Sequence, residues 1–168
     1  MANPTMIQIA TQTLGSTTTA VTFSSIPSTY TDLMFLVNGR SARTNDVGGS
    51  DGKLEFNGVT TSYSSRMLLQ QGGAFSGTSS TIFYFTNSNN ATASTYSNLR
   101  VYVPNYLSSN YKTVGLESVD ENNGSTAYFS TTAGLWSNTA AITSATFTDN
   151  NGGFLSGSTF YLYGIKNS

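Results

Sequence analysis

The chain has 168 residues, lacks cysteine and histidine, and carries seven basic and eight acidic side chains for a formal net charge of −1. The missing residue types exclude disulfides, thiolate nucleophiles, Cys/His zinc sites and a histidine general base. The length fits a single domain, 1–168, with a core of its own. The few basic residues are scattered, so we expect no nucleic-acid partner.

Alternation of apolar and polar residues with a period of two runs through almost the whole chain and predicts β-strands. In the first half the predicted strands span residues 6–14, 20–26, 32–42, 53–57, 62–70 and 81–86. In the second half they span residues 97–103, 111–119, 126–136, 141–148 and 158–165. In the strand 97–103, for example, Leu99 and Val101 face inward while Arg100 and Tyr102 face outward.

Turn signals such as Asn57-Gly58 and Asn122-Asn123-Gly124 separate these runs, and no segment shows a helical period. About ten short strands with regular turns predict an all-β fold. We expect an antiparallel β-sandwich that is jelly-roll-like.

Serine, threonine and asparagine account for 67 of the 168 residues, a composition that also occurs in disordered segments. The 10 phenylalanines and 10 tyrosines recur within the alternating runs and favour a folded domain. No apolar stretch reaches the length of a signal sequence or a membrane span, so we expect neither secretion nor a membrane partner.

Catalytic patterns are weak in this chain. Asp120-Glu121 is the only obvious carboxylate pair. That pair stands next to a turn sequence and is more typical of a hairpin tip. We therefore predict that the protein is not an enzyme and uses no cofactor.

The glycine-rich segment 45–52 holds Asn45, Asp46 and Asp51, whose oxygen atoms are suitable ligands for calcium. Its spacing matches neither an EF-hand loop nor a calcium-binding nonapeptide repeat. We interpret it as a plain loop and predict no metal.

The chain is rich in tyrosine, with 10 residues of this type. Its rigid ring with a polar tip suits protein interfaces and sugar stacking alike, although each ring can also simply cap a sandwich edge. Tyr161 and Tyr163 alternate with Phe160 and Leu162 in the last predicted strand, and Tyr102 faces outward in the strand 97–103. The candidate interface residues are Tyr102, Tyr106, Tyr161 and Tyr163.

Four stretches carry a resemblance: FSSIPSTYTDL (23–33), LRVYVPNY (99–106), GLWSNTAAIT (134–143) and FYLYGI (160–165). With them the chain, from about residue 7 to residue 166, resembles a family of small β-sandwich virion proteins of tailed bacteriophages, especially phages of aquatic bacteria and cyanobacteria. The resemblance implies a structural component of the phage particle and transfers no site residues.

The favoured expectation is a capsid decoration or cement protein on the head exterior, forming a homo-oligomer, with a trimer favoured. Its partners would be other virion proteins, either the major capsid protein or tail proteins, and it would be assembled in the host bacterial cytoplasm. The alternative is a tail or tail-fibre module that binds host-surface glycans through its tyrosines and polar loops such as 86–96. A carbohydrate-binding module of a secreted enzyme is a third, more distant reading.

Overall fold

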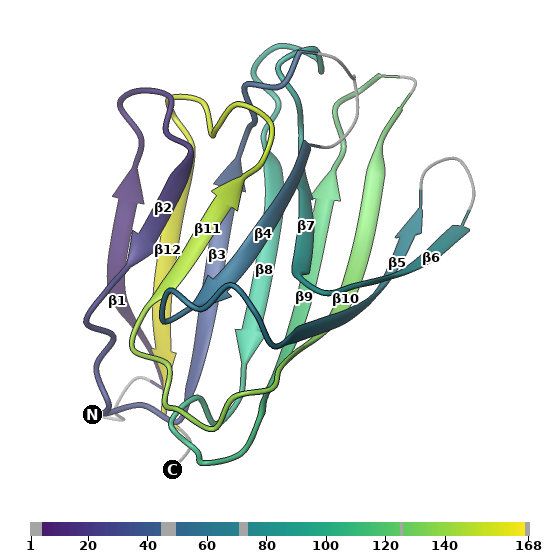
Figure 1. Ribbon diagram of the computed structural model, residues 1–168. Coiled ribbons are helices and arrows are strands. Elements are labelled where there is room, and N and C mark those ends of the chain that lie inside the picture. The colour runs from purple at the N-terminus through teal and green to yellow at the C-terminus, as the bar shows by residue number, and fades with distance from the viewer. Residues whose placement is uncertain (1–4, 45–49, 71–73, 125, 167–168) are drawn as a thin grey trace.

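The computed structural model describes residues 5–44, 50–70, 74–124 and 126–166, which form twelve strands and no helix. The all-β prediction is confirmed, with more strands than the ten or so expected. The additional strand, β6, lies between the predicted strands 62–70 and 81–86, where the sequence predicted no strand. The strands in Figure 1 are β1 (Met6–Thr13), β2 (Ala20–Phe23), β3 (Asp32–Gly39), β4 (Ser50–Phe56), β5 (Tyr63–Gln70), β6 (Ala74–Ser79), β7 (Ile82–Thr86), β8 (Ser97–Val103), β9 (Lys112–Asp120), β10 (Tyr128–Trp136), β11 (Ala145–Asp149) and β12 (Thr159–Ile165).

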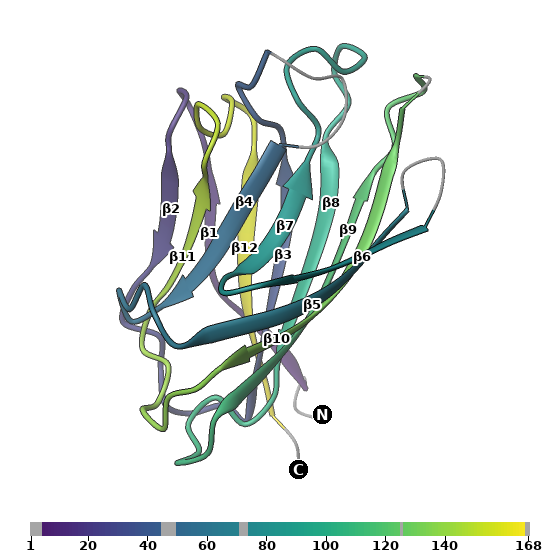
Figure 2. The same cartoon turned by 45° about the vertical axis from the view of Figure 1, so that its right-hand side comes forward.

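The strands form two antiparallel sheets that pack face to face. The large sheet has the order β1-β12-β3-β8-β9-β10-β5-β6, and the small sheet has the order β2-β11-β4-β7. Figure 2 shows the small sheet lying in front of the large one, which curves behind it. The predicted β-sandwich is therefore confirmed.

Eight of the strands pair in a nested order. β1 pairs with β12, β2 with β11, β3 with β8, and β4 with β7, and successive pairs alternate between the two sheets. A long hairpin rolled up in this way is a jelly roll. The structure therefore agrees with the predicted jelly-roll-like topology.

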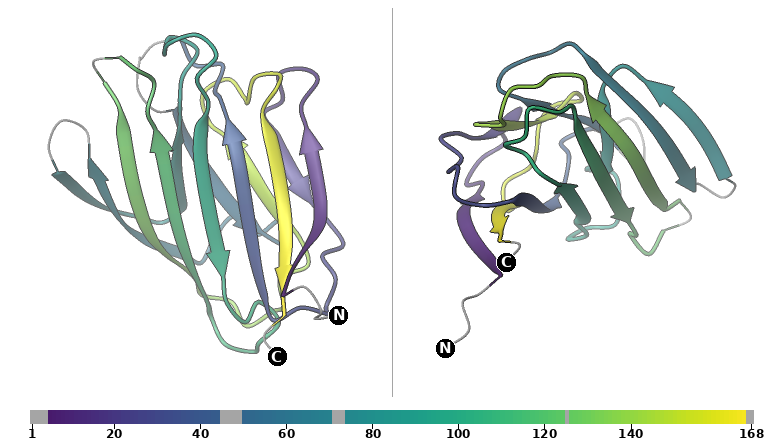
Figure 3. Two further views of the ribbon diagram at one scale, coloured as in Figure 1. Left: turned by 180° about the vertical axis from the view of Figure 1, so that it is seen from behind. Right: turned by 90° about the horizontal axis from the view of Figure 1, so that it is seen from below.

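Two hairpins are inserted into the jelly roll. β5 and β6 lie between β4 and β7 in the chain, and β9 and β10 lie between β8 and β11. The β9–β10 hairpin joins the large sheet beside β8, and the β5–β6 hairpin joins it beside β10, so that this sheet has twice as many strands as the small one. Figure 3 shows the result from behind and end-on, with a broad outer surface formed by the large sheet alone.

Aromatic rings fill the space between the sheets. Phe35 and Phe147 meet edge to face with ring centroids 5.4 Å apart, and Phe56 packs 5.6 Å from Trp136. All four rings are fully buried. Burying a side chain of this size stabilises the fold by about 2 to 3 kcal/mol.

The interior becomes polar toward the end of the sandwich where β7 and β9 finish. Ser118 and Ser130 face each other across β9 and β10 with their hydroxyl oxygens 2.8 Å apart. Beside them Asn122 donates to the carbonyl oxygen of Thr126 at 2.8 Å. Asp120, which is 0% exposed, belongs to the same region.

Candidate binding face on the large sheet

The candidate site is the outer face of the large sheet, which no other element covers within the described residues (Figure 3). Alternation along each strand places one set of side chains in the core and the next set on this surface. On β8 the odd-numbered residues from Leu99 to Val103 are buried, whereas Arg100 and Tyr102 are exposed. The outward orientation of Arg100 and Tyr102 confirms the prediction from the sequence.

The strand register aligns the outward side chains in rows that cross the sheet. Residues directly opposite each other in antiparallel strands point to the same face and lie within contact distance. The first row is Tyr163, Met34, Tyr102 and Gly115, from β12 to β9. The second row is Tyr161, Leu36, Arg100, Glu117 and Thr131, from β12 to β10, and the third is Asn38, Asn98, Val119 and Phe129, from β3 to β10.

Within the described residues, these three rows, which we call the outer face, hold three of the seven exposed large apolar side chains. Tyr102, Val119 and Phe129 belong to the outer face, and Leu68 extends it onto β5 opposite Thr131. All four are exposed, and Leu68 retains 50% of its accessible surface. Apolar side chains that cluster on one face, instead of scattering singly, are typical of an interaction surface.

Tyr102 is held in place at one end of this face. Its hydroxyl donates to Oδ2 of Asp32 at 2.8 Å, and the Asn105 amide donates to the other oxygen of the same carboxylate at 2.8 Å. Ionisation of the phenol would place two negative charges side by side, so the bond to Asp32 raises the pKa of Tyr102. The ring is therefore a fixed, neutral part of the surface.

Arg100 and Glu117 form an ion pair in the middle row, with 2.6 Å between Nη2 and Oε2. Both side chains are about half exposed. A solvated pair of this kind adds at most about 1 kcal/mol to stability. Its two charges instead supply hydrogen-bonding groups between apolar neighbours, which favours specific recognition over nonspecific sticking.

Three shallow hollows run along the outer face on either side of this ion pair. One of about 390 Å³ lies between Met34, Tyr102 and Gly115, where the glycine leaves open space. A second of about 270 Å³ shares Arg100 and Glu117 with the first. The third, of about 280 Å³, lies beside Tyr161 and Tyr163, whose ring centroids are 6.4 Å apart.

The structure brings together three of the four predicted interface residues. Tyr161 and Tyr163 on β12 and Tyr102 on β8 lie on the outer face, two strands apart. The predicted interface role of Tyr106 is wrong, because its ring is fully buried and its hydroxyl donates to the carbonyl oxygen of Pro27. Met34, Leu36 and Glu117 were missed, although their alternation with buried neighbours was a readable signal.

The described residues that the sequence suggested for catalysis or metal binding do not lie together in a catalytic or metal site. Asp120 is buried and Glu121 is exposed, so this carboxylate pair does not converge. Most of the calcium candidate 45–52 lies outside the described residues. Within the described part of the chain, no group of three acidic side chains is placed to hold a metal ion. In the same part of the chain, no helix has the length and apolarity needed to cross a membrane.

Comparisons with known proteins add little to this description. No family model matches the chain, and no curated protein does. A solved structure that it resembles is scytalido-glutamic peptidase with a transition-state analogue inhibitor, at 12% identity and a TM-score of 0.27. The match covers 90% of this chain and 66% of the peptidase chain.

This comparison corrects one prediction. We expected that the protein is not an enzyme, whereas a solved structure that the chain resembles is a peptidase. The likeness is too weak to show that this chain is itself an enzyme, and it carries no argument about function.

Proposed function

We propose that the protein is a structural component of a tailed-bacteriophage particle, a capsid decoration protein that attaches to the head exterior through the outer face of its large sheet. The single observation that carries this proposal is the outer face itself. It combines exposed tyrosine, phenylalanine and aliphatic side chains with one central ion pair, Arg100–Glu117. Aromatic residues enriched over a surface that is poor in charge are typical of protein interfaces.

The fold and the sequence resemblance support the proposal by analogy. Jelly rolls occur among viral capsid proteins and also among lectins, so the fold alone does not choose between them. The four stretches that resemble phage virion proteins favour a capsid protein over a lectin. One of them, 160–165, forms most of β12 and supplies Tyr161 and Tyr163 to the outer face.

The partners and the assembly state are part of the same proposal. The partner is another virion protein, with the major capsid protein favoured over tail proteins. Because virion symmetry repeats each subunit, a homo-oligomer is expected, and a trimer is favoured. Attachment takes place during assembly in the host bacterial cytoplasm, and the mature location is the virion.

We expect on the order of hundreds of copies per particle, since a decoration protein repeats with the capsid lattice. Quantitative mass spectrometry of purified particles of the phage that encodes the chain, referenced to the major capsid protein, measures this number. A count of about six or twelve would instead match tail symmetry and contradict the head location.

One observation favours the second candidate, a tail or tail-fibre module that binds host-surface glycans. A polar pocket opens where the loop 87–96 meets the segment after β11. This loop is among the polar loops that the sequence suggested for sugar binding.

A further inference from the structure

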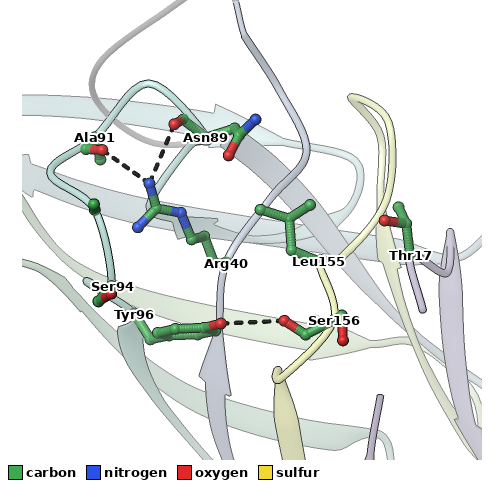
Figure 4. A pocket seen from close by; sticks show the side chains of 9 residues that line it. Thr17, Arg40, Asn89, Ala91, Ser94, Tyr96, Leu155 and Ser156 are labelled. Atoms are coloured by element: carbon green, nitrogen blue, oxygen red, sulfur yellow. Dashed lines mark hydrogen bonds between the residues drawn. The ribbon is translucent and has the colours of Figure 1, made fainter. Parts of the chain in front are cut away.

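The pocket lies at one end of the sandwich and not on the outer face. It has a volume of about 440 Å³ and is formed by loops that are distant in sequence. Figure 4 shows Arg40 from the end of β3, Tyr96 from the loop before β8, and Leu155 and Ser156 from the loop before β12 around one space. This volume is within the usual range for small-molecule sites.

Arg40 holds one wall of the pocket in place. Its Nη1 donates to the carbonyl oxygens of Thr92 and Thr95 at 2.8 and 2.9 Å. Its Nη2 donates to the carbonyl oxygens of Asn89 and Ala91 at 3.1 and 2.8 Å. Four charge-assisted bonds to one short loop fix its backbone, so the pocket is formed before any ligand arrives.

Within the described residues, no carboxylate pairs with the guanidinium of Arg40. The four hydrogen bonds of its guanidinium group go to neutral carbonyl oxygens, and no acidic side chain is among the described residues that line the pocket. The residue is only 6% exposed, so its positive charge lies in a region of low dielectric constant. A buried charge without an opposite partner is costly, and an anion in the pocket would supply that partner.

The remaining lining combines an aromatic ring with hydroxyl groups. The hydroxyl of Tyr96 donates to the carbonyl oxygen of Ser156 at 3.1 Å, as Figure 4 shows. A side chain at Gly157 would come within 2.8 Å of that hydroxyl, so the glycine permits the close approach. Ser94 and Thr17 add further hydroxyl-bearing side chains to the lining. A ring wall with hydroxyl donors and acceptors around it is suited to a sugar.

We propose that this pocket binds an acidic saccharide unit, with its carboxylate near Arg40 and its ring against Tyr96. The inference goes beyond attachment to a capsid and does not rest on it, because the pocket and the outer face are different surfaces. If the experiment disproves saccharide binding in the pocket, the proposal that the outer face attaches to a capsid is unaffected, and the reverse also holds. A decoration protein held by its outer face would still present this end of the sandwich to host-surface glycans.

Binding of the sodium salts of galacturonate and glucuronate to the full chain, followed by NMR chemical-shift titration, tests the proposal. Galactose and glucose are the matched neutral sugars, and inorganic phosphate is the simple anion. We expect the acidic sugars to bind at least about tenfold more tightly than the neutral ones, and to weaken when NaCl rises from about 50 to about 500 mM.

Two variants locate the site. Ala93→Trp fills the pocket from an exposed lining residue and should abolish binding of the acidic sugars. Ser109→Trp adds the same ring to an exposed position at the opposite end of β8 and should leave binding unchanged. Circular dichroism confirms that both variants fold.

Four results would each overturn the proposal. They are the absence of binding by either acidic sugar, equal binding of the neutral sugars, equal binding of inorganic phosphate, and binding that survives Ala93→Trp. Equal binding of phosphate would identify a simple anion site, and survival of binding in Ala93→Trp would place the sugars elsewhere on the protein.

Discussion

Replacing Asp120 with asparagine is expected to stabilise the protein by up to about 4 kcal/mol at pH 8 and to leave its stability at pH 4 almost unchanged. Asp120 is fully buried at the end of β9. Neither carboxyl oxygen makes a well-formed hydrogen bond within the described residues. Burial raises the pKa of this carboxyl from 3.8 to about 7, and the nearby Ser97 hydroxyl offsets part of that rise.

The direction in which stability changes with pH follows from whether the folded or the unfolded state binds the proton of Asp120. Between pH 4 and pH 7 the folded chain keeps Asp120 protonated while the unfolded chain has lost that proton. Stability contributed by this group therefore falls as the pH rises through that window, by about 1.4 kcal/mol per unit, and is constant above it. Asparagine keeps the shape of the protonated acid and removes the titration.

Urea unfolding of the wild type and of Asp120→Asn at pH 4, 6 and 8 measures the effect. Glu117→Gln on the outer face is the control, because Glu117 is solvated and its loss should alter stability by less than about 1 kcal/mol. If the difference between wild type and Asp120→Asn is the same at all three pH values, the carboxyl is not buried as described.

Replacing Arg40 with methionine is expected to destabilise the protein by at least about 3 kcal/mol. Methionine fills a similar volume but removes the guanidinium donors from four carbonyl oxygens, of which that of Thr92 keeps hydrogen bonds from Thr95. Two of these bonds, to Ala91 and Thr92, hold the middle of the loop before β8. Chemical unfolding monitored by the fluorescence of Trp136 gives the loss in the free energy of unfolding.

Arg100→Met is the matched control for this substitution. Arg100 has the same side chain on the outer face, where its partner is the solvated carboxylate of Glu117. Its loss should cost less than about 1 kcal/mol. Similar losses for the two variants would contradict a structural role for the bonds between Arg40 and the loop.

The strands were largely predictable because period-two alternation reports burial directly. The predicted strand 97–103 has the bounds that β8 shows, and its inward residues are those buried in the structure. β6 was missed because Gly72-Gly73 and the small residues after it resemble a loop. In the structure, pairing with β5 makes this segment a strand, and such a partner is not visible in its own composition.

The candidate site was predictable only where the alternation continues. Tyr102 lies inside β8 and was placed correctly, but Pro104 ends the strand and Asn105 turns the chain with a φ of 48°. The alternation is lost there, and the ring of Tyr106 enters the core. Arg40 was missed for a different reason: its partners are backbone carbonyls, which every residue type provides.

Asp120 shows how much depends on one residue at a strand end. The predicted strand 111–119 stops just before it, which placed the carboxylate in a hairpin tip. β9 continues to Asp120, and the same alternation that buries Ser118 then turns Asp120 inward. Extending the predicted strand by one residue changes a solvated acid into a buried one.

The most direct test of the proposed function is to add purified protein back to phage particles that lack it. Leu36→Lys places a charge at the centre of the outer face, between Tyr161 and Arg100. Thr22→Lys places the same charge on an exposed residue of the small sheet. We predict that wild type and Thr22→Lys saturate the particles with similar affinity and that Leu36→Lys binds roughly thirtyfold more weakly. Saturation by Leu36→Lys at wild-type concentrations would contradict attachment through the outer face.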